Sequence, residues 1–141
     1  MKVNNKFYKS VFFIVLTLAF SLLFSSCGKN IEFKNSKIIP SARGNVTVKK
    51  DKNNNYNIKL AISYLAEPER LQPPSKYYVV WLSSEENQIP LNIGQVVGTS
   101  KLHVEFESFS SSKPRQIFVT AEDDYTTQYP SNRVVLETDN F

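Results

Sequence analysis

The sequence of 141 residues contains a single cysteine and a single histidine. One cysteine cannot form an intrachain disulfide, and one histidine leaves histidine-based metal sites and most histidine-dependent catalysis without the groups they need. No apolar run reaches the ~20 residues of a membrane-spanning helix, because the longest one covers only residues 11–24. The single cysteine excludes scaffolds built on intrachain disulfides, and the longest apolar run is shorter than an ordinary membrane-spanning helix.

The chain also has little excess of either charge sign. Its formal net charge is +4, and three of the positive charges are Lys2, Lys6 and Lys9 near the N-terminus. Subtracting these lysines leaves +1 for the rest of the chain. Such a balance gives no electrostatic support for nucleic-acid binding, and we expect no nucleic-acid partner.

The composition is that of one globular domain rich in β-structure. Hydrophobic residues make up 41% and charged residues 21% of the chain, which is typical of a folded protein. Aromatic residues reach 13% and favour strands over a helical bundle. The length allows one domain and not two of ordinary size.

The N-terminus has the layout of an export signal. Lysines precede the apolar run 11–24, and Ser25, Ser26 and Cys27 follow it. This arrangement resembles a bacterial lipoprotein signal, with Phe24 in place of the more usual leucine. The resemblance implies that residues 1–26 are removed and that Cys27 is acylated. An uncleaved anchor, or an ordinary signal with an incidental cysteine, is the alternative.

Acylation of Cys27 would hold the mature chain to a bilayer, since each buried CH₂ contributes ~0.8 kcal/mol. No aspartate or acidic run follows the cysteine, which favours the periplasmic face of the outer membrane. Residues 27–43 lack a clear period and are predicted to form a lipidated tether, with a first short strand near Phe33 or Ile38–Ile39 as an alternative for part of it. The folded domain is then expected over residues 44–141.

From residue 44 onward, segments of alternating apolar and polar residues are separated by turn-forming residues. Their number and spacing predict an all-β fold, an Ig-like antiparallel β-sandwich of about seven strands, with a barrel as the alternative. Residues 66–76 contain three prolines and are predicted to cross between the sheets. Trp81 is expected at the centre of the core. The predicted strands are 46–49, 56–64, 77–82, 89–97, 102–107, 115–122 and 133–138.

Part of the domain resembles the extracytoplasmic C-terminal domain of anti-sigma-K-type factors. The resemblance rests on Tyr78–Leu82, Gly94, Phe118–Glu122, Tyr129–Ser131 and Val134–Leu136. It implies a small β-sandwich. Those factors also have a cytoplasmic sigma-binding region and a transmembrane helix, which this chain lacks, so it is not expected to inhibit a cytoplasmic sigma factor by itself.

The chain is also similar to uncharacterised lipoproteins of Bacteroidetes-type bacteria. The similarity lies in Pro40–Tyr56, Leu65–Pro74, Tyr78–Trp81 and Thr120–Asp124. It implies a lipid-anchored envelope protein and carries no activity with it.

Candidate catalytic or metal-binding residues are few, and we expect the protein to have no enzymatic activity and no cofactor. His103 is predicted to be a solvated residue on the polar face of its strand, and no serine lies in a nucleophile-elbow pattern. Glu122, Asp123 and Asp124 form the densest acidic cluster, which is a weak calcium candidate. Its alternative is a charged turn whose acids pair with nearby bases or backbone N–H groups.

Charge divides unevenly along the mature chain, with +6 over residues 29–59 and −5 over residues 60–141. Anionic headgroups attract basic segments that lie close to the bilayer. One hypothesis is that the basic half lies along the membrane, and the other is simple solvation of its lysines.

Aromatic residues near loops are the best candidates for ligand or partner contacts. They are Tyr77 and Tyr78, beside a proline-rich loop, and Tyr125 and Tyr129 in the loop 123–132. Tyrosine gives a large contact area at a small entropic cost, although sandwich cores also use it. The sequence thus predicts a non-enzymatic binding or scaffold module that engages another envelope protein. The alternative is a small-ligand or carbohydrate binder.

Overall fold

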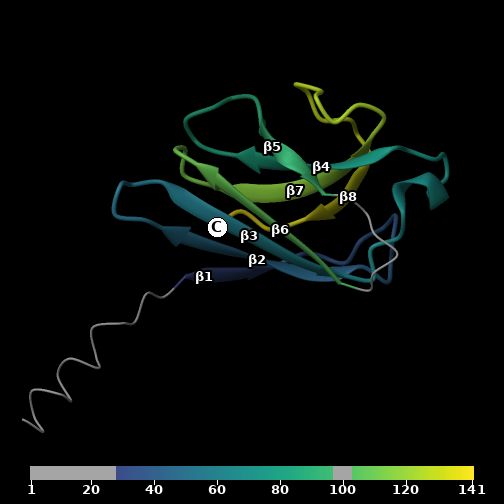
Figure 1. Ribbon diagram of the computed structural model, residues 1–141, viewed down its shortest axis with the longest axis horizontal. Coiled ribbons are helices and arrows are strands. Elements are labelled where there is room, and N and C mark those ends of the chain that lie inside the picture. Colours follow the sequence, from purple (N-terminus) through teal and green to yellow (C-terminus); the bar gives the residue numbers. More distant parts are fainter. Residues whose placement is uncertain (1–27, 97–102) are drawn as a thin grey trace, which may run out of the picture.

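The computed structural model describes residues 28–96 and 103–141, so the predicted signal 1–26 and Cys27 lie outside the described residues. Within the described part, eight strands form two antiparallel sheets that pack face to face (Figure 1). The all-β sandwich predicted from the sequence is confirmed. None of the described residues form a helix with the length and hydropathy needed to cross a membrane.

Each sheet has four strands. In spatial order, the first sheet contains β1 (Lys29–Glu32), β2 (Arg43–Lys50), β3 (Tyr56–Ser63) and β6 (His103–Ser110). The second contains β5 (Leu91–Val96), β4 (Tyr77–Ser83), β7 (Gln116–Glu122) and β8 (Val134–Glu137). Strands β2 to β8 correspond to the seven predicted strands.

The order of the strands is Ig-like. Strands β2, β3 and β6 follow the A-B-E order of that fold, and β4, β7 and β8 follow its C-F-G order. The predicted crossing between sheets is present, because residues 64–76 lead from β3 in the first sheet to β4 in the second. A 3-10 turn, Pro68–Arg70, lies within this connection.

Alternating residues of both sheets point between them and form the core. In β3, every second residue from Ile58 to Ile62 is fully buried, and the residues between them are partly or fully exposed. This is the pattern expected for a strand with one face on the core. The largest inward-facing side chains are Ile58, Leu60, Ile62, Tyr78, Leu82, Ile117 and Leu136.

The predicted tether over residues 27–43 is wrong for most of its length. Strand β1 pairs with β2 in antiparallel register, and Phe33 bridges to Thr138 beside β8. Ile39 and Ala42 are buried in the core. Backbone pairing and these few apolar contacts order a segment whose composition alone is that of a spacer. The folded domain therefore begins two residues after Cys27, and no long spacer separates it from that residue.

Candidate functional site

A second apolar cluster lies on the outer face of the second sheet, away from the main core. Val79, Trp81 and Phe118 form it, with Tyr77 and Val134 packed against them. The Trp81 and Phe118 rings stack with centroids 6.3 Å apart. The expectation that Trp81 lies at the centre of the sandwich is wrong, because alternation puts Tyr78 and Val80 there instead. Strand β4 is covered on both faces, which accounts for its unbroken apolar sequence.

A chain of hydrogen bonds runs from this cluster to the loop after β7. Trp81 Nε1 donates to Thr120 Oγ1 at 2.8 Å, and Thr120 Oγ1 donates to Glu122 Oε1 at 2.5 Å. The backbone N–H of Ser131 donates to the same carboxylate oxygen at 2.9 Å. The side chains of Trp81, Thr120 and Glu122 are all buried. Each of them has a hydrogen-bond partner, as buried polar groups require. The loop is thereby held down on the sheet.

Side chains also hold the tip of this loop in place. The Asp124 carboxylate accepts hydrogen bonds from the backbone N–H and the hydroxyl of Thr126, at 2.8 and 2.7 Å. The backbone hydrogen bond, followed by the side-chain one, lowers the pKa of Asp124. The Tyr125 ring meets the Tyr77 ring edge-on, with centroids 5.2 Å apart.

Asn92 of β5 ties the loop to the neighbouring strand. Its Nδ2 donates to the carbonyl oxygens of Tyr125 and Thr127, both at 2.9 Å. The register between β4 and β5 shifts next to Trp81, leaving Ile93 without a partner residue. This bulge pairs Asn92 with Trp81 and so places it on the outer face, toward the loop.

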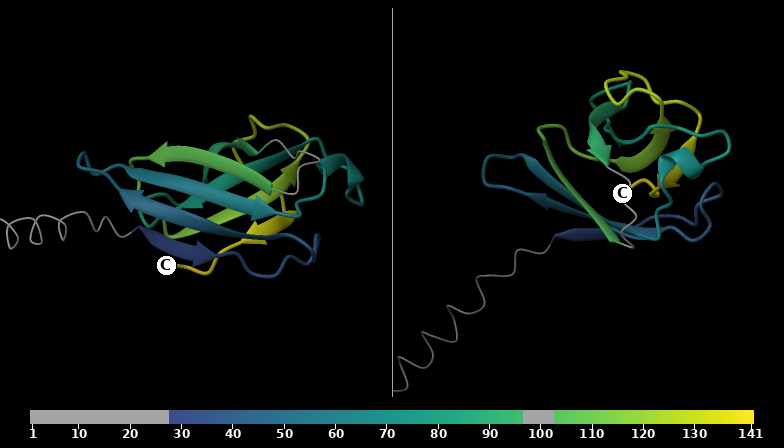
Figure 2. Two further views of the ribbon diagram at one scale, coloured as in Figure 1. Left: turned by 60° about the horizontal axis from the view of Figure 1, so that its bottom comes forward. Right: turned by 45° about the vertical axis from the view of Figure 1, so that its right-hand side comes forward.

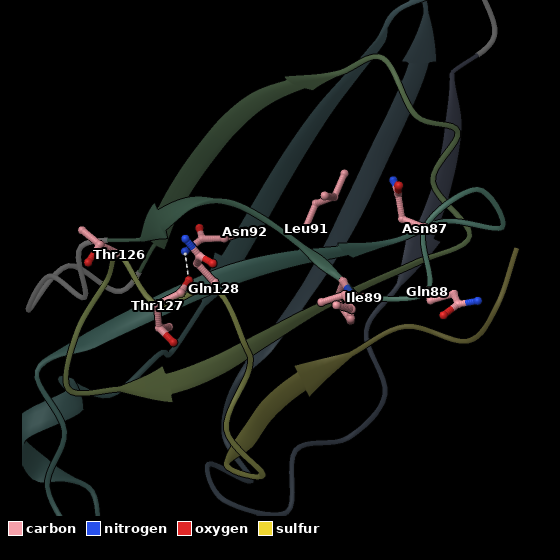
Figure 3. Close-up of a pocket in the computed structure, with 9 residues that line it drawn as sticks. Asn87, Gln88, Ile89, Leu91, Asn92, Thr126, Thr127 and Gln128 are labelled. Carbon is pink, nitrogen blue, oxygen red and sulfur yellow. Dashed lines mark hydrogen bonds between the residues drawn. The ribbon is translucent and has the colours of Figure 1, made fainter.

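An open hollow of about 580 Å³ lies between the start of β5 and this loop (Figure 3). In Figure 3 the side chains of residues 87–89 lie at one end of the hollow, and those of Asn92 and residues 126–128 at the other. Its lining combines amides, hydroxyls and apolar side chains and contains no ionisable group. The lining residues are Asn87, Gln88, Ile89, Pro90, Leu91, Asn92, Thr126, Thr127 and Gln128.

Replacing Asn92 by aspartate is expected to release the loop, because it exchanges both N–H donors for an oxygen that repels the two carbonyls. The free energy of unfolding should fall by about 1–3 kcal/mol, and hydrogen exchange should rise at residues 125–128. Asn87→Asp is the matched control, since Asn87 lines the same hollow without bonding to the loop. Equal exchange in both variants would contradict this role of Asn92.

The predicted tyrosine contacts separate into two groups. Tyr125 and Tyr129 are 46% and 65% exposed and flank the three loop residues that line the hollow. Tyr77 is half-buried under Tyr125. The prediction for Tyr78 is wrong, because its ring is fully buried in the core and its hydroxyl donates to the Ala66 carbonyl at 2.9 Å. Burial raises the pKa of Tyr78.

The structure does not bring the calcium candidates together. The Glu122 carboxylate is buried on the outer face of the second sheet and accepts from Thr120 and Ser131, whereas Asp124 accepts from Thr126. Asp123 is exposed. Across residues 28–96 and 103–141, no three acidic, histidine or cysteine side chains gather as a metal-binding group.

The outer face of the first sheet is polar and charged. There His103 lies at 3.2 Å from Ser63 Oγ and at 3.4 Å from Glu105 Oε1. The sequence predicted His103 on this face but gave no sign of Ser63, which reaches it through strand pairing. His103 and Glu105 side chains are 55% and 81% exposed, so water competes for both hydrogen bonds. This exposure does not suit the fixed, water-excluded geometry of acyl-transfer catalysis.

A smaller hollow of about 410 Å³ lies on the same face, between Thr47 and Glu107. The Asn57 amide donates to Glu107 at 2.7 Å, and Lys59 Nζ lies 3.1 Å from the same carboxylate. These two contacts lower the pKa of Glu107. Lys59 and Glu107 at this hollow thus pair with each other, in contrast to the neutral lining of the larger hollow.

The fold and the larger hollow define a class of protein, an Ig-like all-β sandwich with an ordered loop over the outer face of one sheet. Comparisons with known proteins find no matching family model, no matching curated protein and no matching solved structure. The similarities to anti-sigma-K-type domains and to Bacteroidetes-type lipoproteins stay predictions.

Proposed function

We propose that this protein is a lipid-anchored binding module of the bacterial cell envelope that engages another envelope protein. The binding surface is the loop face, which we define as residues 87–92 together with residues 125–129. The observation that carries the proposal is a hollow with a neutral lining, surrounded by exposed apolar and aromatic side chains. Those exposed side chains are Ile89, Leu91, Tyr125 and Tyr129.

The loop face has the composition of a protein interface. Interface centres are depleted in charged residues and enriched in tyrosine, and they carry polar groups that pair with the partner's backbone. The amides of Gln88 and Gln128 are such groups on this surface. Because the hollow has no ionisable side chain, it offers no general acid or base. Binding without a chemical step is therefore the function that this geometry supports.

The anchor is proposed from the N-terminal sequence. Acylation at Cys27 would fix the chain two residues before β1, which lies in the first sheet. The loop face belongs to the second sheet, and both views in Figure 2 separate β1 from the loop after β7. This separation supports an arrangement in which the anchor leaves the loop face accessible. We propose the periplasmic face of the outer membrane as the location.

Carbohydrate binding is the second candidate. The observation that favours it is the set of amide and hydroxyl groups in the hollow, with tyrosine rings at its margin. Such groups can pair with sugar hydroxyls while an aromatic ring covers an apolar sugar face.

Photo-crosslinking in the host cell tests the proposal. A photoreactive amino acid at Tyr129, on the loop face, is expected to give one discrete protein adduct. The same group at Glu105, on the outer face of the first sheet, is the control and should give none. An adduct from position 105 alone would contradict the assignment of the surface. Glycan-array binding that Tyr125→Ala and Tyr129→Ala abolish, without any protein adduct, would favour the carbohydrate candidate.

A further inference from the structure

One end of the first sheet gathers residues from three strands beside the start of the described chain. Strand pairing aligns Lys49 of β2 with Asn57 of β3, and Asn57 with Phe109 of β6. Gly28 runs directly against this row, because a Cβ on it would lie 2.7 Å from Lys49 Cγ. Since Gly28 follows Cys27 in the sequence, the proposed acylation point lies within one residue of this end of the sheet.

This end carries four exposed lysines, namely Lys29, Lys49, Lys50 and Lys52. None of the four forms an ion pair within the described part of the chain. The acid among them, Asp51, accepts hydrogen bonds from the backbone N–H groups of Asn53 and Asn55, both at 2.8 Å. Its carboxylate shapes the hairpin turn. The four ammonium groups therefore have no carboxylate partner, although that of Lys29 lies 5.2 Å from the centroid of the Phe141 ring.

An aromatic side chain projects from the same end. Phe109 is 66% exposed, more than any other large hydrophobic residue of the described chain. Behind it in the sheet, the Lys50 ammonium lies 5.8 Å from the centroid of the Tyr56 ring. Lys49 lies on the same face of the sheet as Phe109, and Lys29 and Lys50 lie on the other face. Exposed lysines and an exposed aromatic ring at one end of a domain are typical of surfaces that lie in the interfacial region of a membrane.

We infer that this surface, the cationic end (Lys29, Lys49, Lys50, Lys52 and Phe109), docks on anionic phospholipid headgroups. The lysines meet the headgroup phosphates, and the Phe109 ring enters the interfacial layer. The inference rests on the proposed lipid anchor, because acylation beside Gly28 brings this end to the bilayer. Anionic lipid attracts each lysine near the surface, and the attraction falls off within a Debye length. The anchor brings this end to the bilayer but does not bring it to a protein partner with an acidic surface.

Docking at the cationic end gives the domain a preferred orientation. The hairpin between β2 and β3 and the start of β1 then lie at the membrane, while the loop face belongs to the opposite sheet (Figures 1 and 2). A lipid anchor alone would leave the domain free to rotate. The cationic end restricts this rotation and turns residues 125–129 of the loop face away from the membrane, whereas Asn87, at the near end of the loop face, hydrogen-bonds to Ser112 close to Phe109.

Lipid quenching of an introduced tryptophan tests the orientation. Full-length lipidated Phe109→Trp protein is reconstituted in vesicles that contain brominated phosphatidylcholine, with or without phosphatidylglycerol. The tryptophan at position 109 is expected to lose most of its fluorescence when phosphatidylglycerol is present. Tyr129→Trp is the matched control, an equally exposed site on the loop face, and should lose little. The wild-type protein gives the background of Trp81, which is fully buried.

Reversing the charges of Lys49, Lys50 and Lys52 to glutamate in the Phe109→Trp protein should abolish the extra quenching, and so should high salt. Sedimentation of the same samples reports on the anchor separately. Protein that sediments with the vesicles but shows equal quenching at positions 109 and 129 overturns the docking inference and leaves the anchor intact. Protein that carries no lipid and stays in solution overturns the proposed anchor and, with it, the inference.

Discussion

Trp81→Ala is expected to lower the free energy of unfolding by about 3–5 kcal/mol, the range for removing a large buried aromatic side chain. The ring is fully buried and stacks on Phe118. Its removal also leaves the Thr120 hydroxyl without its donor. Because Thr120 continues to Glu122 and the loop, the loss should spread to residues 123–133. Hydrogen exchange there is expected to rise well before global unfolding.

Chemical denaturation of the wild type and the variant measures the change. Phe109→Ala is the control, because it truncates an aromatic side chain that is mostly exposed, and should stay within about 0.5 kcal/mol of the wild type. A Trp81→Ala loss below about 1 kcal/mol, or unchanged exchange in the loop, would show that the second apolar cluster does not support the loop face.

Cys27→Ala is expected to abolish membrane attachment of the mature protein. Without the thiol there is no group to acylate, so the precursor should stay uncut or the chain should leave the membrane fraction. Ser26→Ala keeps a small residue before the cysteine and should be processed as the wild type is. Fractionation of the cells followed by immunoblotting measures both variants. A Cys27→Ala protein that is still cut and labelled with fatty acid would contradict the lipoprotein assignment.

The strands that could be predicted are those in which apolar and polar side chains alternate, or in which all side chains are apolar. Strand β3 alternates cleanly from Tyr56 to Ser63, and β4 is apolar on both faces. Strand β1 has the sequence Lys-Asn-Ile-Glu, with one apolar residue, Ile31. Its pairing with β2 forms backbone hydrogen bonds that leave no periodic signal in so short a segment.

The candidate site was only partly predictable, for reasons of geometry. Adjacent Tyr77 and Tyr78 point to opposite faces of β4, and an all-apolar strand does not reveal which face meets the main core. The tie from Asn92 to the loop joins residues 33 and 35 positions apart, beyond any local pattern. The sequence indicates that Glu122 is one acid of a charged turn. Only the fold shows that its carboxylate is buried against Thr120.

The most direct test of the account is the mass of the N-terminal peptide of the protein isolated from membranes. We expect a peptide that begins at Cys27 and carries a diacylglyceryl group and an acyl chain. Such a peptide would place a lipid two residues before β1 and beside the cationic end. An unmodified Cys27, found within an uncut chain or in a soluble fraction, would contradict the account.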